Sequence, residues 1–267
     1  MAVRLFLLRI MVVIGLLGPC SQLLAEEAGE TADTGSQRTL TAVLAAADYP
    51  PFYWKDNGKL TGISIDVLAY VAKRLDIRIE YRRLSWPRVL QALERGSVDM
   101  VTTFFNTAER APYVVYTGVP HAYESNHFFA LPGSNISYDG DLTKLSTFRI
   151  GTIKGYAYGE AFDQASYLLT EHVLDEPTLV RMVYGKRFDL GVGNPYAIKL
   201  EVKRHGYEPP LRFLSPPVDR SPIFMAFSRQ NPDALALSID FTRVIAQFKQ
   251  TPAYQRLLER YEMDGQP

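Results

Sequence analysis

Short apolar strands alternate with amphipathic helices along this chain, and this alternation limits the possible fold more than any other feature. Residues 40–45 are a mostly apolar stretch typical of a buried strand, and residues 66–75 place their apolar side chains on one helical face. A strand is predicted at 77–82, a helix at 85–96 and another strand at 98–103. Strands separated by helices of about ten residues pair in parallel, so we predict an α/β fold.

The same alternation begins again in the second half of the chain. A strand is predicted at 148–153, and a helix follows it from Tyr156. Another helix begins at Pro177, a strand covers 188–192, and a helix covers 195–205. Two sets of strands and helices predict two lobes of similar build.

The order of these sets assigns residues to each lobe. We expect 38–127 and 222–267 to form lobe one, and 128–221 to form lobe two with the hinge segments. The extended segments 128–131 and 215–221 are predicted to connect the lobes. A chain that leaves one lobe and later returns to it crosses twice, and two such crossings make a natural hinge.

The first residues have the pattern of a secretory signal peptide. Arg4 and Arg9 precede an uncharged apolar run at 10–18, and Ala25 is a small residue at the expected cleavage point. We therefore predict a signal peptide at 1–25, a flexible polar leader at 26–37 and an exported mature protein. A membrane anchor is the alternative, but the apolar run is shorter than the ~20 residues of a spanning helix.

Cys20 raises a further possibility, which is lipid attachment at a mature N-terminus. Pro19 directly before it fits that processing signal poorly. If cleavage follows Ala25, the single cysteine of the chain is removed. The mature protein would then have no disulfide, no thiol nucleophile and no cysteine metal ligand.

Several function classes find no support in the sequence. The chain has 29 basic and 29 acidic residues, so no basic excess indicates nucleic-acid binding. It shows no phosphate-binding glycine loop, no histidine pair at metal spacing and no nucleophile elbow. The four histidines are scattered, and we expect no metal site, no cofactor and no catalytic residue.

A candidate anion site follows the strand at 98–103. Thr107 is predicted to cap a short helix, and Arg110 follows three residues later. Free backbone N–H groups beside a guanidinium bind a carboxylate well, because arginine donates two parallel charge-assisted hydrogen bonds. A surface salt bridge is the alternative for Arg110.

Aromatic residues are concentrated in a second candidate region. The loop at 48–54 follows the first predicted strand and contains Tyr49, Phe52 and Trp54. Open α/β sheets bind ligands at the carboxyl ends of their strands, where aromatic rings can contact apolar or cationic groups. Phe52 and Trp54 could instead cover the sheet end as core residues. Trp86, which also follows a strand, is expected at the same crevice.

Several short motifs of this chain occur in the same order as in a known protein family. The chain resembles family 3 extracellular solute-binding proteins, the periplasmic receptors of polar amino-acid ABC importers, from residue 38 to about 262. The motifs that carry the resemblance are Tyr-Pro-Pro-Phe at 49–52, 58–66, 93–99, 107–110, Gly-Thr-Ile-Lys-Gly at 151–155 and 188–194. The resemblance implies two Rossmann-like lobes joined by two hinge strands, the type II periplasmic binding protein fold, with a ligand between the lobes.

The resemblance also implies a set of ligand-binding residues, with Arg110 clamping a ligand carboxylate. The set is Tyr49, Phe52, Trp86, Thr103, Phe105 and Arg110 from lobe one, completed by Lys154, Tyr156 and Asn194 from lobe two. Two positions depart from the family pattern. Tyr156 and Ala157 stand where small hydroxyl residues are usual, and Asn194 stands where an aspartate commonly pairs with the ligand ammonium. An organic acid or an unusual amino-acid derivative is therefore a candidate ligand beside a standard amino acid.

These features together predict a periplasmic solute-binding protein. We expect a monomer that captures a small carboxylate-bearing solute and delivers it to an ABC permease in the inner membrane. One alternative is a periplasmic enzyme similar to cyclohexadienyl dehydratases, suggested by Ser-Trp-Pro at 85–87, with Glu124 or Glu160 as its general acid. The other is a ligand sensor that acts through a separate membrane receptor.

Overall fold

The computed structural model describes residues 37–263 of the chain. The predicted signal peptide, nearly all of the predicted leader, and Cys20 lie outside the described residues, so their roles stay predictions. Within 37–263, no helix combines the length and the apolar character that crossing a membrane requires.

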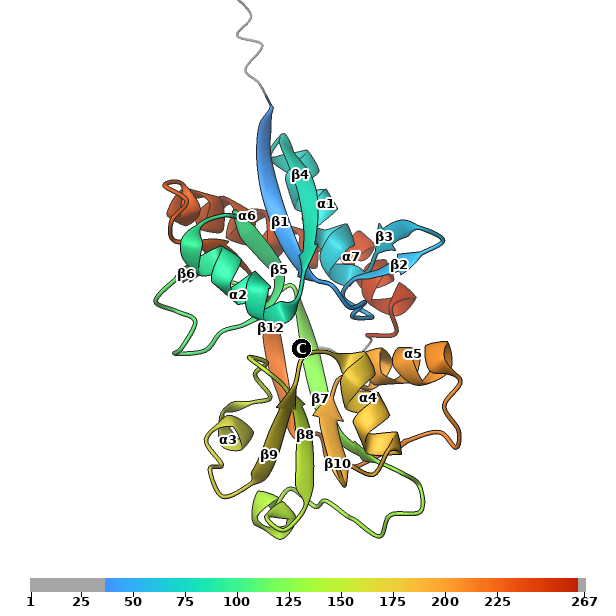
Figure 1. Cartoon of the computed structure of the whole chain (residues 1–267). Coiled ribbons are helices and arrows are strands. Elements are labelled where there is room, and N and C mark those ends of the chain that lie inside the picture. Colours follow the sequence, from blue (N-terminus) through green and yellow to red (C-terminus); the bar gives the residue numbers. More distant parts are fainter. Residues whose placement is uncertain (1–36, 264–267) are drawn as a thin grey trace, which may run out of the picture. The chain divides into compact units, whose positions relative to one another are not determined.

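Lobe one is built on a parallel sheet (Figure 1). Strand β1 is parallel to β4 on one side and to β5 on the other, as the strand–helix alternation predicts. The parallel strands are β1 (Arg38–Ala45), β4 (Ile77–Leu84) and β5 (Met100–Phe105), and the short strand β6 (Val114–Tyr116) pairs antiparallel with β12 (Asp219–Ser228). A hairpin and four helices accompany them, namely β2 (Trp54–Asp56), β3 (Lys59–Thr61), α1 (Ile63–Arg74), α2 (Trp86–Arg95), α6 (Ala234–Lys249) and α7 (Pro252–Arg260).

Lobe two repeats the parallel arrangement on a smaller scale. Strand β8 is parallel to both β10 and β9, and β9 forms the edge of the sheet. The elements are η1 (Leu142–Leu145), β8 (Arg149–Ile153), α3 (Glu160–Asp163), β9 (Leu169–Val173), α4 (Glu176–Tyr184), β10 (Leu190–Gly193), α5 (Pro195–His205) and β11 (Arg212–Phe213). Helix α5 begins at its predicted position because Asn194 caps it, accepting a hydrogen bond from the Tyr196 amide at 2.9 Å.

Two long antiparallel strands, β7 (Ala122–Ala130) and β12 (Asp219–Ser228), join the lobes (Figure 1). They pair with each other over residues 122–126 and 219–223. The sequence placed the first crossing at 128–131, but Phe128 and Phe129 pair with β10 within lobe two. The apolar run that seemed to be a linker is part of the lobe two core, because one strand continues from the crossing into the sheet.

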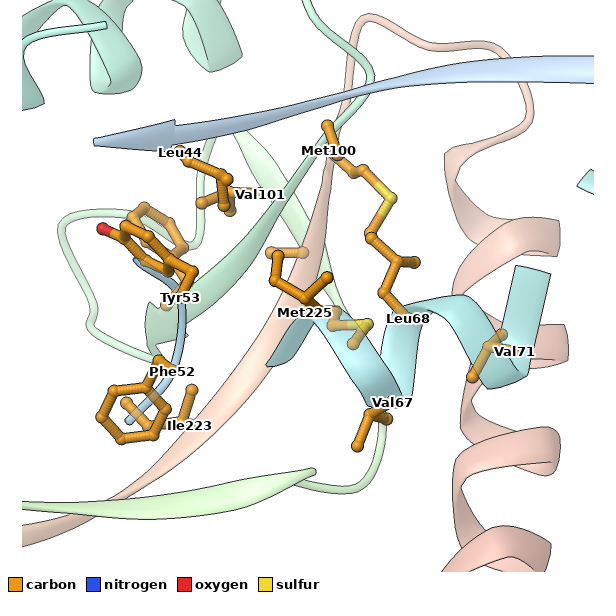
Figure 2. Packing of buried hydrophobic residues seen from close by; sticks show 14 of the residues in the cluster. Leu44, Phe52, Tyr53, Val67, Leu68, Val71, Met100, Val101, Ile223 and Met225 are labelled. Atoms are coloured by element: carbon orange, nitrogen blue, oxygen red, sulfur yellow. The ribbon is translucent and has the colours of Figure 1, made fainter. Parts of the chain in front are cut away.

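Each lobe has its own apolar core. The lobe one core packs α1, β1, β5 and β12 together, and Figure 2 shows Leu68, Met100 and Met225 among its members. In lobe two, successive residues of β7 point to opposite faces of the sheet, so Phe128 and Phe129 enter different clusters. The lobe two sheet is therefore covered on both faces, as a parallel α/β sheet requires.

Candidate functional site

A cavity lies where the two lobes and the crossing strands meet. Its volume is about 30 Å³, which is room for little more than water-sized groups. Residues from lobe one, both crossing strands and the loop after β8 of lobe two line it: Tyr49, Tyr53, Trp86, Thr103, Phe105, Arg110, Glu124, Tyr156, Ala157 and Ile223.

Arg110 enters this cavity from the turn after β5. Its side chain is 5% exposed, and its guanidinium donates to the Phe105 carbonyl at 3.2 Å and to the Gly155 carbonyl at 2.9 Å. The guanidinium carbon lies 4.3 Å from the centre of the Phe104 ring. Burial lowers the pKa of Arg110, and no carboxylate of the described residues lies within ion-pair distance of it. The surface salt bridge considered for Arg110 is therefore absent from the described part of the chain.

The backbone around Arg110 differs from the predicted helix. Residues 108–113 form hydrogen-bonded turns, in which the Arg110 and Ala111 amides both donate to the Thr107 carbonyl. Pro112 explains the difference, because proline has no N–H to continue a helix and disfavours helical backbone in the residue before it. Arg110 therefore reaches the cavity without the helix N-terminus that the sequence suggested.

Three aromatic residues pack against one another beside Arg110. The Tyr156 ring meets the Tyr49 ring edge-on at 6.1 Å and the Trp86 ring edge-on at 5.1 Å between centroids. Trp86 also donates its indole N–H to the Gly155 carbonyl at 2.8 Å. Tyr156 and Gly155 belong to lobe two, so these contacts and the Arg110 hydrogen bond link the lobes across the cavity.

Two buried glutamates accompany these aromatic residues. Glu124, on β7, accepts a short hydrogen bond from the Tyr49 hydroxyl, and Glu176, at the start of α4, accepts one from the Tyr156 hydroxyl at 2.7 Å. Burial raises the pKa of each carboxyl to about 7. Hence each glutamate can gain or lose a proton near neutral pH, whereas an exposed glutamate remains ionised there.

A chain of buried hydroxyls extends from the cavity into lobe one. Thr103 donates to the Ser64 hydroxyl at 3.0 Å, and Ser64 contacts Nε2 of His121 at 2.8 Å. Burial lowers the pKa of His121 to about 3, so its ring is neutral at physiological pH. The neutral ring holds the Ser64 hydroxyl, which in turn holds the Thr103 hydroxyl at the cavity wall.

An ion-pair bridge connects the lobes outside the cavity. Asp48 precedes the aromatic residues of lobe one and pairs with Arg83 at 2.7 Å and, by a short contact, with Arg204 of α5. Arg204 also pairs with Glu201 at 3.1 Å. Burial alone would raise the pKa of Asp48, but the hydrogen bonds from Arg204 and Arg83 outweigh it and lower this pKa.

Residues 42–264 match the sequence model described as bacterial extracellular solute-binding proteins, family 3. The chain belongs to this family. Family membership confirms the resemblance seen in the motifs.

The individual relatives share only low sequence identity with this chain. The chain is 20% identical to a probable amino-acid-binding protein, YxeM, of Bacillus subtilis, over 79% of each chain. It is 29% identical to a probable histidine-binding protein of Campylobacter jejuni, over 39% of this chain and 41% of the relative.

Solved structures of the same architecture confirm the type II periplasmic binding protein fold. An ancestral arginine-binding protein bound to glutamine matches with a TM-score of 0.71 at 20% identity, covering 86% of this chain and all of that chain. The ancestral amino-acid-binding protein AncCDT-1, a precursor of cyclohexadienyl dehydratase, matches with a TM-score of 0.67 at 21% identity, covering 84% and 95%. At these identities the likeness shows the fold alone.

The structure brings together most, but not all, of the predicted site residues. Those that line the cavity are Tyr49, Trp86, Thr103, Phe105, Arg110 and Tyr156. Phe52 is 1% exposed and belongs to the lobe one core, which was the alternative reading of that residue. Lys154 is exposed, and its amide donates to the Val173 carbonyl. Asn194 lies beside the cavity, where its amide contacts Glu124 at 3.4 Å.

Sequence reasoning missed part of the site. The missed lining residues are Tyr53, Ala157 and Ile223, and Glu124 was considered only as the acid of a possible enzyme. Glu124 carried a usable signal, since it occupies an inward-facing position of an alternating strand together with Ala122 and Asn126. Glu176 carried no such signal, because it contacts the cavity only indirectly, through its hydrogen bond with Tyr156.

Proposed function

We propose that this chain is a periplasmic binding protein that captures a small carboxylate-bearing solute, an amino acid or a related acid, for an ABC importer. The observation that carries the proposal is the buried Arg110 guanidinium, which faces the cavity without an ion-pair partner among the described residues. Burying a charge is costly unless it is paired. A carboxylate in the cavity supplies that partner, and the six predicted residues that line the cavity, with Asn194 beside them, are our proposed binding set.

Closure of the lobes provides the mechanism. A cavity of about 30 Å³ is too small to admit an amino acid, so the lobes must separate to load it. A solute that contacts Arg110 on lobe one and Tyr156 on lobe two then favours the closed form, because only that form contacts it from both sides. We propose the paired part of β7 and β12 as the hinge. The function needs no chemical step, and we propose a monomeric, non-catalytic receptor.

A screen of amino acids, polyamines and organic acids by thermal shift tests this function. A true ligand at a hundred times its dissociation constant should stabilise the protein by about 2.7 kcal/mol. The radius of gyration from small-angle scattering should fall when that ligand saturates the protein. The proposal is wrong if the stabilising compounds lack a carboxylate, or if a tight binder leaves the radius of gyration unchanged.

The ion pair between Asp48 of lobe one and Arg204 of lobe two should stabilise the closed form, and Arg204→Ala tests this role. The Arg204 side of the pair is partly exposed, so loss of the pair should weaken ligand binding only about two- to fivefold. Calorimetry with the screened ligand measures the change. Arg243→Ala is the control, because Arg243 pairs with Asp240 within one helix and joins no lobes. Equal affinities in the two variants would show that the bridge does not favour closure.

One observation favours a second candidate, a dehydratase similar to cyclohexadienyl dehydratases. Glu124 is a buried carboxyl in the cavity with a pKa of about 7, which suits a general acid. Incubation with prephenate and arogenate separates the two functions. Conversion of either compound that is lost in Glu124→Gln would establish the enzyme, and the absence of turnover would leave the receptor.

A further inference from the structure

Unpaired buried charge is concentrated at one place in the described part of the chain. The buried side chains that can carry a full charge near neutral pH are Asp48, Arg110, Glu124, Glu176 and Glu201. Asp48 and Glu201 both have an arginine partner. The other three have no ion pair within 37–263, and Arg110 and Glu124 line the same cavity. The cavity therefore presents one cationic and one acidic group, each without a partner of opposite charge.

Glu124 reaches the cavity from the hinge. It lies on β7 opposite Ser221 of β12, within the paired segment that connects the lobes. Both of its hydrogen bonds fall on Oε1, from the Tyr49 hydroxyl of lobe one and from the Asn194 amide of lobe two. Asn194 is neutral and cannot itself pair with a cation. The acidic group that contacts it is supplied by β7.

The groups around Glu124 make its charge costly. Burial is the main cause of its raised pKa, and the hydrogen bonds from Tyr49 and Asn194 offset this effect only in part. Glu176 from α4 and Asp219 from β12 raise the pKa by smaller amounts. Tyr53 of the aromatic loop lines the same cavity. On the opposite side, Glu124 borders a second cavity of about 370 Å³, which is also lined by His127 and Arg220. That space is large enough for water, and water there can take up a proton from Glu124.

We propose that Glu124 binds a cationic group of the solute, in place of a lobe two acid, and releases its proton to solvent as that group enters. This inference rests on the proposed function, because it concerns the same cavity. The protonated carboxyl loses its O–H proton, and the carboxylate then pairs with the ammonium of the solute. The ligand class is accordingly a zwitterion, with a carboxylate on Arg110 and an ammonium on Glu124.

Proton release fixes how affinity depends on pH. The ammonium needs the ionised carboxylate, which is the minor form below the pKa of about 7 and the major form above it. Affinity for a zwitterion should therefore rise about tenfold between pH 6 and pH 8 and then level off. A solute that accepts a hydrogen bond from the protonated carboxyl would show the opposite trend.

Matched pairs of solutes test the proposal. The probes are L-leucine with 4-methylpentanoate, L-phenylalanine with 3-phenylpropanoate and L-glutamate with glutarate, titrated by calorimetry at pH 6 and pH 8. In each pair that binds, we expect the amino member to bind at least tenfold tighter at pH 8 and to tighten about tenfold from pH 6. Titrations in two buffers of different ionisation enthalpy should show proton release at pH 6.

Glu124→Gln should bind the amino members at least tenfold more weakly at pH 8 and with no pH dependence. Glu176→Gln is the matched control, since Glu176 is equally buried, has the same pKa and also bonds a tyrosine, yet does not line the cavity. The pH dependence should survive in that variant. If Glu124→Gln does not fold, the comparison of the solute pairs in the natural protein still decides the matter.

The possible outcomes distinguish failure of the Glu124 assignment from failure of the proposed receptor function. If carboxylates bind through Arg110 but the des-amino members bind as tightly, or if affinity falls toward pH 8, Glu124 does not recognise a cation while the receptor stands. Survival of the pH dependence in Glu124→Gln and its loss in Glu176→Gln would also overturn the assignment. Failure of every member of the panel and of the wider screen to bind would overturn the proposed function itself.

Discussion

Replacement of Arg110 by alanine should weaken solute binding thirtyfold or more. The variant removes a buried bidentate donor and leaves the solute carboxylate desolvated and unpaired, which costs on the order of 2–5 kcal/mol. It also removes the hydrogen bond from Arg110 to the Gly155 carbonyl of lobe two, so closure loses a contact as well. Calorimetry with the best ligand of the screen measures the loss.

Two further variants show whether the geometry of the guanidinium matters. Arg110→Lys should recover only part of the affinity, because an ammonium cannot reproduce the planar fork of arginine. Arg243→Ala, at an exposed arginine paired with Asp240, should bind normally. If a folded Arg110→Ala protein retains full affinity, the solute lies elsewhere and both proposals for the cavity are wrong.

Local patterns predicted the elements of the fold well. The helix expected at 85–96 is α2 (Trp86–Arg95), and Gly96 ends it in the left-handed conformation at φ 71°. The helix expected at 195–205 is α5 (Pro195–His205), capped by Asn194. These predictions succeeded because caps, glycine ends and apolar periodicity act over a few residues, and the sequence displays them directly.

The segment after β8 shows where local patterns failed. A helix was expected from Tyr156, but only Glu160–Asp163 is helical. Gly155 and Gly159 both have positive φ, and the Tyr158 hydroxyl turns back to accept a hydrogen bond from the Ile153 amide at 2.7 Å. This compact loop delays the helix, and it presents Tyr156 and Ala157 to the cavity.

The acidic half of the site depends on contacts between distant parts of the chain. Glu124 meets Tyr49 and Asn194 across sequence separations of 75 and 70 residues. No periodicity or motif encodes such meetings, because they arise only when both lobes pack against the crossing strands. The sequence therefore placed Arg110 at the cavity, because this residue follows a recognisable motif. It considered Glu124, which contacts Asn194 of a different motif, only as the acid of a possible enzyme.

Gly62→Ala should destabilise the protein by about 3 kcal/mol or more. Gly62 precedes α1 with φ 127° and ψ 160°, a conformation that is essentially restricted to glycine. An added Cβ would lie 2.7 Å from the Tyr53 amide nitrogen and closer still to the Phe52 carbonyl, both of them backbone atoms. These atoms cannot move aside cheaply, since the Phe52 and Pro51 carbonyls accept hydrogen bonds from the first amides of α1.

Gly58→Ala is the matched control for this prediction. Gly58 also has a positive φ, 80°, but its added Cβ would meet nothing within 4 Å. Its replacement should cost only the conformational penalty of about 1–2 kcal/mol. Urea unfolding measures both losses, and a common m-value would show that the midpoints report stability.

The fraction of Gly62→Ala protein that stays folded should also bind solute more weakly, because the strain falls on the loop that carries Tyr53 to the cavity wall. Equal losses of stability in the two variants would show that the loop moves to accommodate the added Cβ at little cost. The close contact between Gly62 and the aromatic loop would then not determine the position of Tyr53 at the cavity.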